Sequence, residues 1–131
     1  MALQPHLTGR ASEVVTESDT AARVGSGDVP VLATPALLAL LEAACCDAVA
    51  GHVDPGRTTV STRVQLEHLV ASPPGSRLTA HARLAHVDGR HLRFEVLAED
   101  DTGRLVGHGQ VTRRIVDRAT FLERAGQSGS A

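Results

Sequence analysis

The stretch that decides the fold reads Thr34-Pro35-Ala36-Leu37-Leu38-Ala39-Leu40-Leu41-Glu42-Ala43-Ala44-Cys45-Cys46-Asp47-Ala48-Val49-Ala50-Gly51. Thr34 followed by Pro35 predicts a helix N-cap and first helical residue, and Gly51 predicts the stop. Glu42 and Asp47 are the only charged residues in between. This helix of about four turns is therefore apolar on nearly every face, and such a helix must be covered on most sides.

The chain after this helix alternates between apolar and polar residues, as strands with one buried face do. We expect strands at residues 58–69, 76–87, 91–99 and 104–116, and a first strand at residues 12–20 ahead of the helix. The later strands are separated by short turn sequences, namely Pro73-Pro74-Gly75, Asp88-Gly89 and Asp101-Thr102-Gly103, which favour an antiparallel meander. The order predicts an α+β hot-dog fold, an antiparallel sheet wrapped around one long central apolar helix.

The length of 131 residues fits one domain, which we place at residues 1–125, and the Gly/Ser-rich residues 126–131 are expected to be a disordered tail. Apolar residues make up 42% of the chain, but Phe94 and Phe121 are its only aromatic residues apart from histidine. The core must therefore be built from Leu, Val and Ala. A single sheet of this kind leaves edges and part of the helix uncovered, so we expect a homodimer, with a tetramer left open.

Charge and cysteine usage exclude several classes of protein. The net charge is −2, which argues against a nucleic-acid partner. No apolar run is long enough to span a bilayer, and residues 1–10 do not have the pattern of a signal peptide. Cys45 and Cys46 are neighbours within the helical pattern, which favours a buried, reduced pair in a cytoplasmic protein over a disulfide.

Glu42 and Thr34 are the first candidates for chemistry. Burying an unpaired carboxylate is costly, so Glu42 either finds a partner such as Arg63 or Arg113, has a raised pKa, or faces a wet cavity. Capping the helix would alone explain Thr34, but the backbone N–H groups and the dipole at a helix start also stabilise a carbonyl oxygen that gains negative charge. Eight residues separate the two, about 12 Å along a helix, so only a substrate or a two-fold axis could bring them together.

His68 is the third candidate, because it ends a predicted strand just before a turn. Such a position suits a reactive imidazole, although most of the seven histidines are expected to face solvent. The histidines and cysteines show no spacing typical of a metal site, so we expect no metal and no other cofactor.

Several segments resemble the fluoroacetyl-CoA thioesterase-like branch of the hot-dog proteins. The likeness covers roughly residues 10–123 and rests on Thr34 at the helix start, Glu42 eight residues later, and Cys45 after a pair of small residues. The stretch from Thr59 to Gly75, with His68 ahead of a Pro-Gly turn, is similar to the strand and turn of that family. The remaining strands match at Asp88-Gly89-Arg90, Phe94-Glu95-Val96 and Gly107-His108-Gly109 through Arg113.

The resemblance implies hydrolysis of acyl-CoA thioesters at a dimer interface. Thr34 would polarise or attack the carbonyl, His68 would act as general base, and Glu42 would support the nucleophile or the attacking water. Arg113 would lie near the pocket or the CoA, and Ser61 close to the substrate. The chain departs from the family in carrying Ser61 instead of the usual Gly, and Gln110-Val111 instead of the usual Thr-His.

Two other functions remain open at this stage. A non-catalytic acyl-CoA-binding hot-dog protein would keep the pocket without needing Thr34 or His68. A hot-dog enoyl-CoA hydratase or dehydratase is similar in one respect, because Gly27-Asp28-Val29-Pro30 matches the start of its motif. That motif then requires a His shortly after the Pro, whereas Val31-Leu32-Ala33 follow here.

Overall fold

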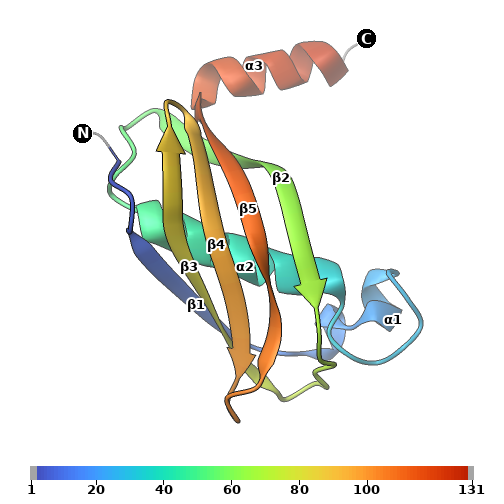
Figure 1. Cartoon of the computed structure of the whole chain (residues 1–131). Helices are drawn as coiled ribbons and strands as arrows, with labels where there is room; N and C mark the ends of the chain where they lie inside the picture. The colour runs from blue at the N-terminus through green and yellow to red at the C-terminus, as the bar shows by residue number, and fades with distance from the viewer. Residues whose placement is uncertain (1–2, 130–131) are drawn as a thin grey trace.

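The computed structural model describes residues 3–129, with side chains described through residue 126. Its elements are β1 (Thr8–Val14), the helical turn η1 (Glu17–Asp19), α1 (Ala21–Val24), α2 (Thr34–Val49), β2 (Arg57–His68), β3 (Arg77–Asp88), β4 (His91–Asp100), β5 (Leu105–Asp117) and α3 (Arg118–Gly129). The strands form one antiparallel sheet in the order β1-β3-β4-β5-β2, and α2 crosses one face of it (Figure 1). The predicted central helix and the four strands after it are confirmed to within one residue at each end.

The core lies between α2 and the inner face of the sheet. Alternate residues of β3 and β4 point at the helix, and Phe94 is the only large ring among these buried side chains. The backbone of β1 comes so close to α2 that a Cβ on Gly9 would lie 2.2 Å from the backbone nitrogen of Ala48. A small-residue core therefore lets the sheet wrap tightly around the helix, as predicted.

The first strand was placed too late in the sequence. It spans Thr8–Val14 and not residues 12–20, because the chain after Val14 turns into η1. The carboxylate of Asp19 accepts hydrogen bonds from the backbone N–H of Thr16, at 2.8 Å, and from its hydroxyl, at 3.0 Å. This capping box stabilises a helical turn where the Val and Thr content alone favoured a strand.

Two further differences concern the cysteines and the C-terminus. Both cysteines are free, but only Cys45 is buried, which raises the pKa of its thiol to about 12, while Cys46 is exposed. The helix α3 begins after Asp117, whose carboxylate accepts the backbone N–H of Thr120 at 3.0 Å as an N-cap does. It continues to Gly129, into the segment 126–131 for which we predicted disorder. Residues 130–131 lie outside the described residues, and the division at residue 125 stays a prediction.

Backbone hydrogen bonds bring the start of α2 beside the end of β2. Ahead of the helix, the N–H of Leu32 donates to the carbonyl of Ser72, and that of Ala33 to the carbonyl of Asp19, both at 2.8 Å. After β2, the N–H of Leu69 donates to the carbonyl of Val106 at 2.8 Å. These bonds hold the segment just ahead of Thr34 against the segment that follows His68. No helix in the described part of the chain is long and apolar enough to cross a membrane.

Candidate active site

Thr34 and His68 meet at the junction between α2 and β2. The hydroxyl Oγ1 of Thr34 lies 2.8 Å from Nδ1 of His68. The prediction that Thr34 caps the helix was wrong, because Ala33 occupies the N-cap position and Thr34 is the first helical residue. Its hydroxyl makes no capping hydrogen bond and contacts the imidazole instead. Helix capping therefore does not explain a threonine at this position.

Burial sets the protonation of His68. The other ring nitrogen, Nε2, is buried and has no hydrogen-bond partner among the described residues. Burial lowers the pKa of His68 below its ordinary value of 6.5, and the backbone of Val70 opposes this shift in part. The imidazole is consequently neutral at pH 7, the state in which a ring nitrogen accepts a proton from a hydroxyl.

A cavity of about 330 Å³ opens beside this pair. Its lining includes Thr34 and His68, and most of the rest comes from small or apolar residues of the segments 26–33 and 69–71. The helix start supplies fewer donors to it than expected. Pro35 has no N–H, and the N–H groups of Ala36 and Leu37 both donate to the carbonyl of Ala33 at 3.0 Å. Among the first residues of α2, that leaves the N–H of Thr34 without a backbone acceptor.

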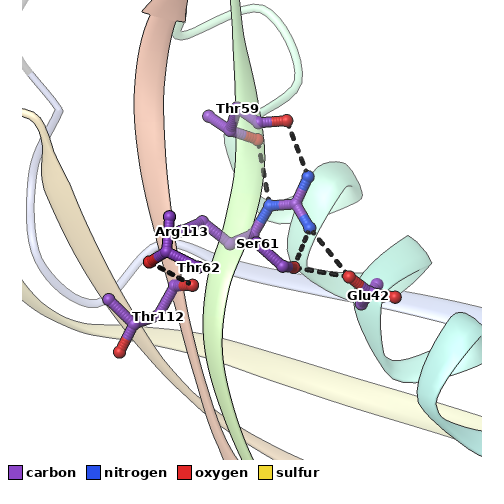
Figure 2. A network of polar contacts seen from close by, with 6 residues as sticks. All are labelled: Glu42, Thr59, Ser61, Thr62, Thr112 and Arg113. Atoms are coloured by element: carbon purple, nitrogen blue, oxygen red, sulfur yellow. Dashed lines mark hydrogen bonds and ion pairs between the residues drawn. The ribbon is translucent and has the colours of Figure 1, made fainter. Parts of the chain in front are cut away.

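Glu42 belongs to a second polar cluster, nearer the middle of α2 (Figure 2). Its Oε2 accepts a hydrogen bond from the hydroxyl of Ser61 at 2.5 Å and pairs with Nη1 of Arg113 at 3.4 Å. Arg113 also donates from Nη1 to the Ser61 hydroxyl at 2.6 Å, from Nε to the hydroxyl of Thr59 at 3.0 Å, and from Nη2 to the carbonyl of Thr59 at 2.8 Å. The guanidinium is thus buried with a hydrogen bond from each of its nitrogens, whereas the Glu42 side chain stays 32% exposed.

Strand register explains why Ser61 and Arg113 meet. They are directly paired between β2 and β5, and the register then shifts so that Thr62 is an extra residue opposite Thr112. The hydroxyl of Thr62 donates to the carbonyl of Thr112 at 3.4 Å across this bulge (Figure 2). Bulges bend and twist a strand locally, and this one lies immediately after the residue that contacts Glu42.

The predicted site residues therefore form two groups. Thr34 joins His68, while Glu42 joins Ser61 and Arg113, and no hydrogen bond or ion pair links the two groups among the described residues. Of the two arginines considered as partners for Glu42, Arg113 fills that role and Arg63 is exposed. The role of Thr59, whose carbonyl and hydroxyl both accept hydrogen bonds from Arg113, was not predicted. The one available signal is that Thr59 precedes Ser61 by two residues and so lies on the same face of the strand.

Comparison with known proteins shows the family to which this chain belongs. A family model described as "Fluoroacetyl-CoA-specific thioesterase" matches residues 15–119. The fluoroacetyl-CoA thioesterase of Streptantibioticus cattleyicolor is 33% identical over 101 residues, which cover 77% of this chain and 72% of that protein. This chain belongs to the fluoroacetyl-CoA-specific thioesterase family. Its reaction class is accordingly the hydrolysis of acyl-CoA thioesters.

Solved structures agree with this membership. A fluoroacetyl-CoA thioesterase variant in complex with acetyl-CoA is 26% identical and superposes with a TM-score of 0.91, covering 96% of this chain and 98% of the other. A hot-dog-like protein from Thermanaerovibrio acidaminovorans, at 19% identity, has a TM-score of 0.83 over 95% of this chain and 91% of its own. The predicted hot-dog fold is confirmed.

Ser61 stands where the resemblance to the family leads us to expect Gly, and a glycine has no hydroxyl. In this thioesterase, the Ser61 hydroxyl lies between Arg113 and Glu42 and contacts both. The carboxylate is therefore held by two donors where a glycine would leave it one. Among the described residues, no group of three or more His, Cys, Asp or Glu side chains is arranged to hold a metal ion.

Proposed function

We propose that this protein hydrolyses the thioesters of CoA with short acyl groups, with Thr34 and His68 at the reacting centre. The observation that carries the proposal is the 2.8 Å contact between the Thr34 hydroxyl and Nδ1 of His68, beside a cavity of about 330 Å³. Ligand pockets commonly range from about 300 to 1,000 Å³, so this one suits a small acyl group. Relatives support the same range, since one is a fluoroacetyl-CoA thioesterase and another was solved with acetyl-CoA.

The chemistry follows from the protonation of the pair. Neutral His68 accepts a proton at Nδ1 while an oxygen nucleophile attacks the thioester carbonyl. The nucleophile is either the Thr34 oxygen or a water held by it, and the imidazole is the base in both routes. The C–S bond then breaks, and the proton on Nδ1 passes to the departing CoA thiolate. If Thr34 attacked directly, a water must afterwards hydrolyse the acyl-threonine.

A homodimer would bring Glu42 to this centre. β2 pairs only with β5, so one of its edges is free within the described chain. The helix α2 also exposes small residues along one face, namely Pro35, Ala39, Ala43 and Cys46. If a two-fold axis pairs two β2 edges antiparallel, the start of one strand lies beside the end of the other. The Glu42–Ser61–Arg113 cluster of one subunit then approaches the Thr34–His68 pair of the second, where a carboxylate would orient the imidazole or the water.

The first test measures free-thiol release from a panel of CoA esters that runs from acetyl and fluoroacetyl to long-chain and aromatic acyl groups. We expect turnover of the short esters, and its loss in Thr34→Val, which keeps the side-chain shape but removes the hydroxyl. If no ester is hydrolysed while CoA esters still bind, the protein is a non-catalytic acyl-CoA-binding module. If Thr34→Val retains full turnover, the reacting centre lies elsewhere.

Subunit mixing tests the shared site. Thr34→Val and Glu42→Gln homodimers should both be inactive. In a mixed dimer, one centre combines an intact Thr34 with an intact Glu42 from the other chain, so re-association of the two variants should restore activity. If each reacting centre were instead built from a single chain, the mixture would be as inactive as the two parent homodimers. Light scattering should meanwhile give twice the mass of the chain.

We propose that the protein is cytoplasmic, on the basis of its thiols. Both cysteines are free, and Cys46 is exposed, which suits a reducing environment such as the cytoplasm. Fractionation of cells that express the full chain would test this.

A further inference from the structure

A cleft on the opposite face of the sheet from α2 is rich in arginine. It has a volume of about 670 Å³ and lies between α3 and the outward side chains of β2 and β5. Its lining contains four arginines, which are Arg57, Arg90, Arg114 and Arg124. We call this the arginine cleft. Figure 1 shows α3 standing at the end of the sheet, beyond the last residues of β5 and near the start of β2.

Register and helix spacing build the arginine cleft. Val60 pairs with Arg114, one position beyond the pair of Ser61 and Arg113, which faces α2. Successive strand residues point to opposite faces, so Arg114 points outward. On α3, Phe121 and Arg124 are three residues apart and share one face of the helix. Both line the cleft, and the Phe121 side chain is 41% exposed there.

Among the described residues, the positive charge in the cleft is neutralised only in part. None of its four arginines has a side-chain hydrogen bond or ion pair in the described part of the protein, whereas Arg83, Arg104 and Arg113 each pair with a carboxylate. Asp117 is the one acidic residue of the lining. Its pKa is lowered mainly by hydrogen bonds from the backbone and hydroxyl of Thr120, and further by the nearby charges of Arg57 and Arg90. Four guanidinium groups thus gather around one carboxylate in a chain whose net charge is −2.

We infer that the arginine cleft binds the phosphorylated nucleotide end of CoA, an adenosine that carries phosphates on its 3′ and 5′ sides. Guanidinium groups bind phosphate oxygens through paired hydrogen bonds, and an exposed aromatic ring such as that of Phe121 stacks on a base. The inference rests on the proposed function, because it assigns the part of the substrate that the cavity beside Thr34 is too small to hold.

The distance between the arginine cleft and the Thr34–His68 pair of the same chain implies that the cleft binds the substrate of the other subunit. β2 has 12 residues, so its two ends are roughly 36 Å apart. The cleft lies at the start of this strand and the Thr34–His68 pair at its end, farther apart than the extended pantetheine arm of CoA reaches. In the proposed dimer, antiparallel β2 edges place the cleft of one subunit and the reacting centre of the second at the same end of the combined sheet. There the arm can pass around the strand ends without crossing the sheet.

Direct binding tests the cleft without relying on catalysis. Calorimetry should detect adenosine 3′,5′-bisphosphate, and Arg57→Ala/Arg114→Ala should weaken its binding roughly ten-fold, which corresponds to about one charged hydrogen bond. A matched control is Arg10→Ala/Arg77→Ala, which removes two exposed arginines outside the cleft. Equal binding by the cleft variant and the wild type would overturn the inference. Inorganic phosphate that binds as tightly as the bisphosphate would also overturn it, by making the cleft a general anion site.

Kinetics separates this inference from the proposed function. The cleft variant should raise the KM for acetyl-CoA roughly ten-fold with kcat little changed, and leave the KM for acetyl-N-acetylcysteamine, which has no nucleotide, unaltered. If no ester is hydrolysed while the bisphosphate still binds in a cleft-dependent way, the proposed function is wrong and the inference stands. If acetyl-CoA is hydrolysed but the cleft variant leaves its KM unchanged, the inference is wrong and the proposed function stands.

Mixed dimers test whether the cleft acts across subunits. One chain carries Arg57→Ala/Arg114→Ala and the other carries His68→Ala, so the only intact imidazole lies on the chain with the altered cleft. If the cleft binds the substrate that the other subunit hydrolyses, the mixed dimer should show the low KM of the wild type. The chain with the intact His68 would then use the intact cleft of the chain that carries His68→Ala. A raised KM would show that the cleft serves its own chain and would overturn this part of the inference.

Discussion

The two polar clusters beside α2 differ in how firmly their members are held. Thr34 and His68 share one hydrogen bond, and the second nitrogen of His68 has no partner in the described chain. Arg113, by contrast, uses all three of its nitrogens to bind Thr59, Ser61 and Glu42. A pair with a single contact can exchange partners during a reaction, whereas a fully bonded network fixes geometry. We therefore propose that the first cluster transfers the proton and that the second positions the reacting groups.

Replacing His68 by Ala should have the largest effect on activity. Without the base, kcat should fall at least about 100-fold, the lower end of what general base catalysis contributes. The matched control is His81→Ala, on the outer face of the sheet, where Nε2 lies 3.2 Å from the carboxylate of Glu99. Thiol release from acetyl-CoA measures both variants. Equal losses in the two would show that the first cluster has no special role.

Arg113→Met should have the largest effect on stability. It removes a buried guanidinium and its hydrogen bonds to Thr59, Ser61 and Glu42, and we expect a loss of roughly 2–4 kcal/mol in the free energy of unfolding. Arg63→Met is the control, because Arg63 is exposed on the neighbouring strand and surface substitutions usually change stability by about 0.5 kcal/mol or less. Urea unfolding gives both values. An Arg113→Met protein as stable as the control would contradict the positioning role.

The sequence predicted the regular parts of this fold well, because each has one dominant local signal. The apolar run after Pro35, broken only by Glu42 and Asp47, and the alternation in residues 76–87 admit few other structures. The first strand failed because the Thr16–Asp19 capping box outweighed β-propensity. The helix α3 was missed although Asp117 followed by a run of helix-forming residues offered an N-cap signal. The Gly and Ser residues at the end of the chain masked it.

The sequence offered candidate site residues, but it did not determine the contacts between them. Helical spacing correctly separated Thr34 from Glu42. Glu42 pairs with Arg113 and not with Arg63 because of the strand face that each arginine occupies. The bulge at Thr62 changes which residues of β2 point to each face. Contact between Thr34 and His68 depends on loop hydrogen bonds from Leu32 and Leu69, which leave no periodic trace in the sequence.

Ser61→Ala should have a smaller effect than Arg113→Met in the same cluster. The variant removes one donor to Glu42 but leaves Arg113 in place, so we expect about 1 kcal/mol less stability and a few-fold drop in kcat/KM. Ser12→Ala serves as control, since it also removes a serine hydroxyl that bonds another side chain, Thr79, at an exposed site. An unchanged kcat/KM with Ser61→Ala would indicate that the hydroxyl does not position Glu42 for catalysis.

The pH dependence should show the finest difference between the clusters. Burial disfavours the imidazolium form of His68, so its pKa lies below 6.5 and the neutral base persists into mildly acidic solution. Activity should accordingly be level around pH 7 and fall only as the pH drops through this lowered pKa. The unfolded chain binds the proton more tightly than the folded one, so stability from this group is also lost as the pH falls below 6.5. A profile of kcat/KM against pH whose acid limb lies above 6.5 would mean that the titrating base is not a buried His68.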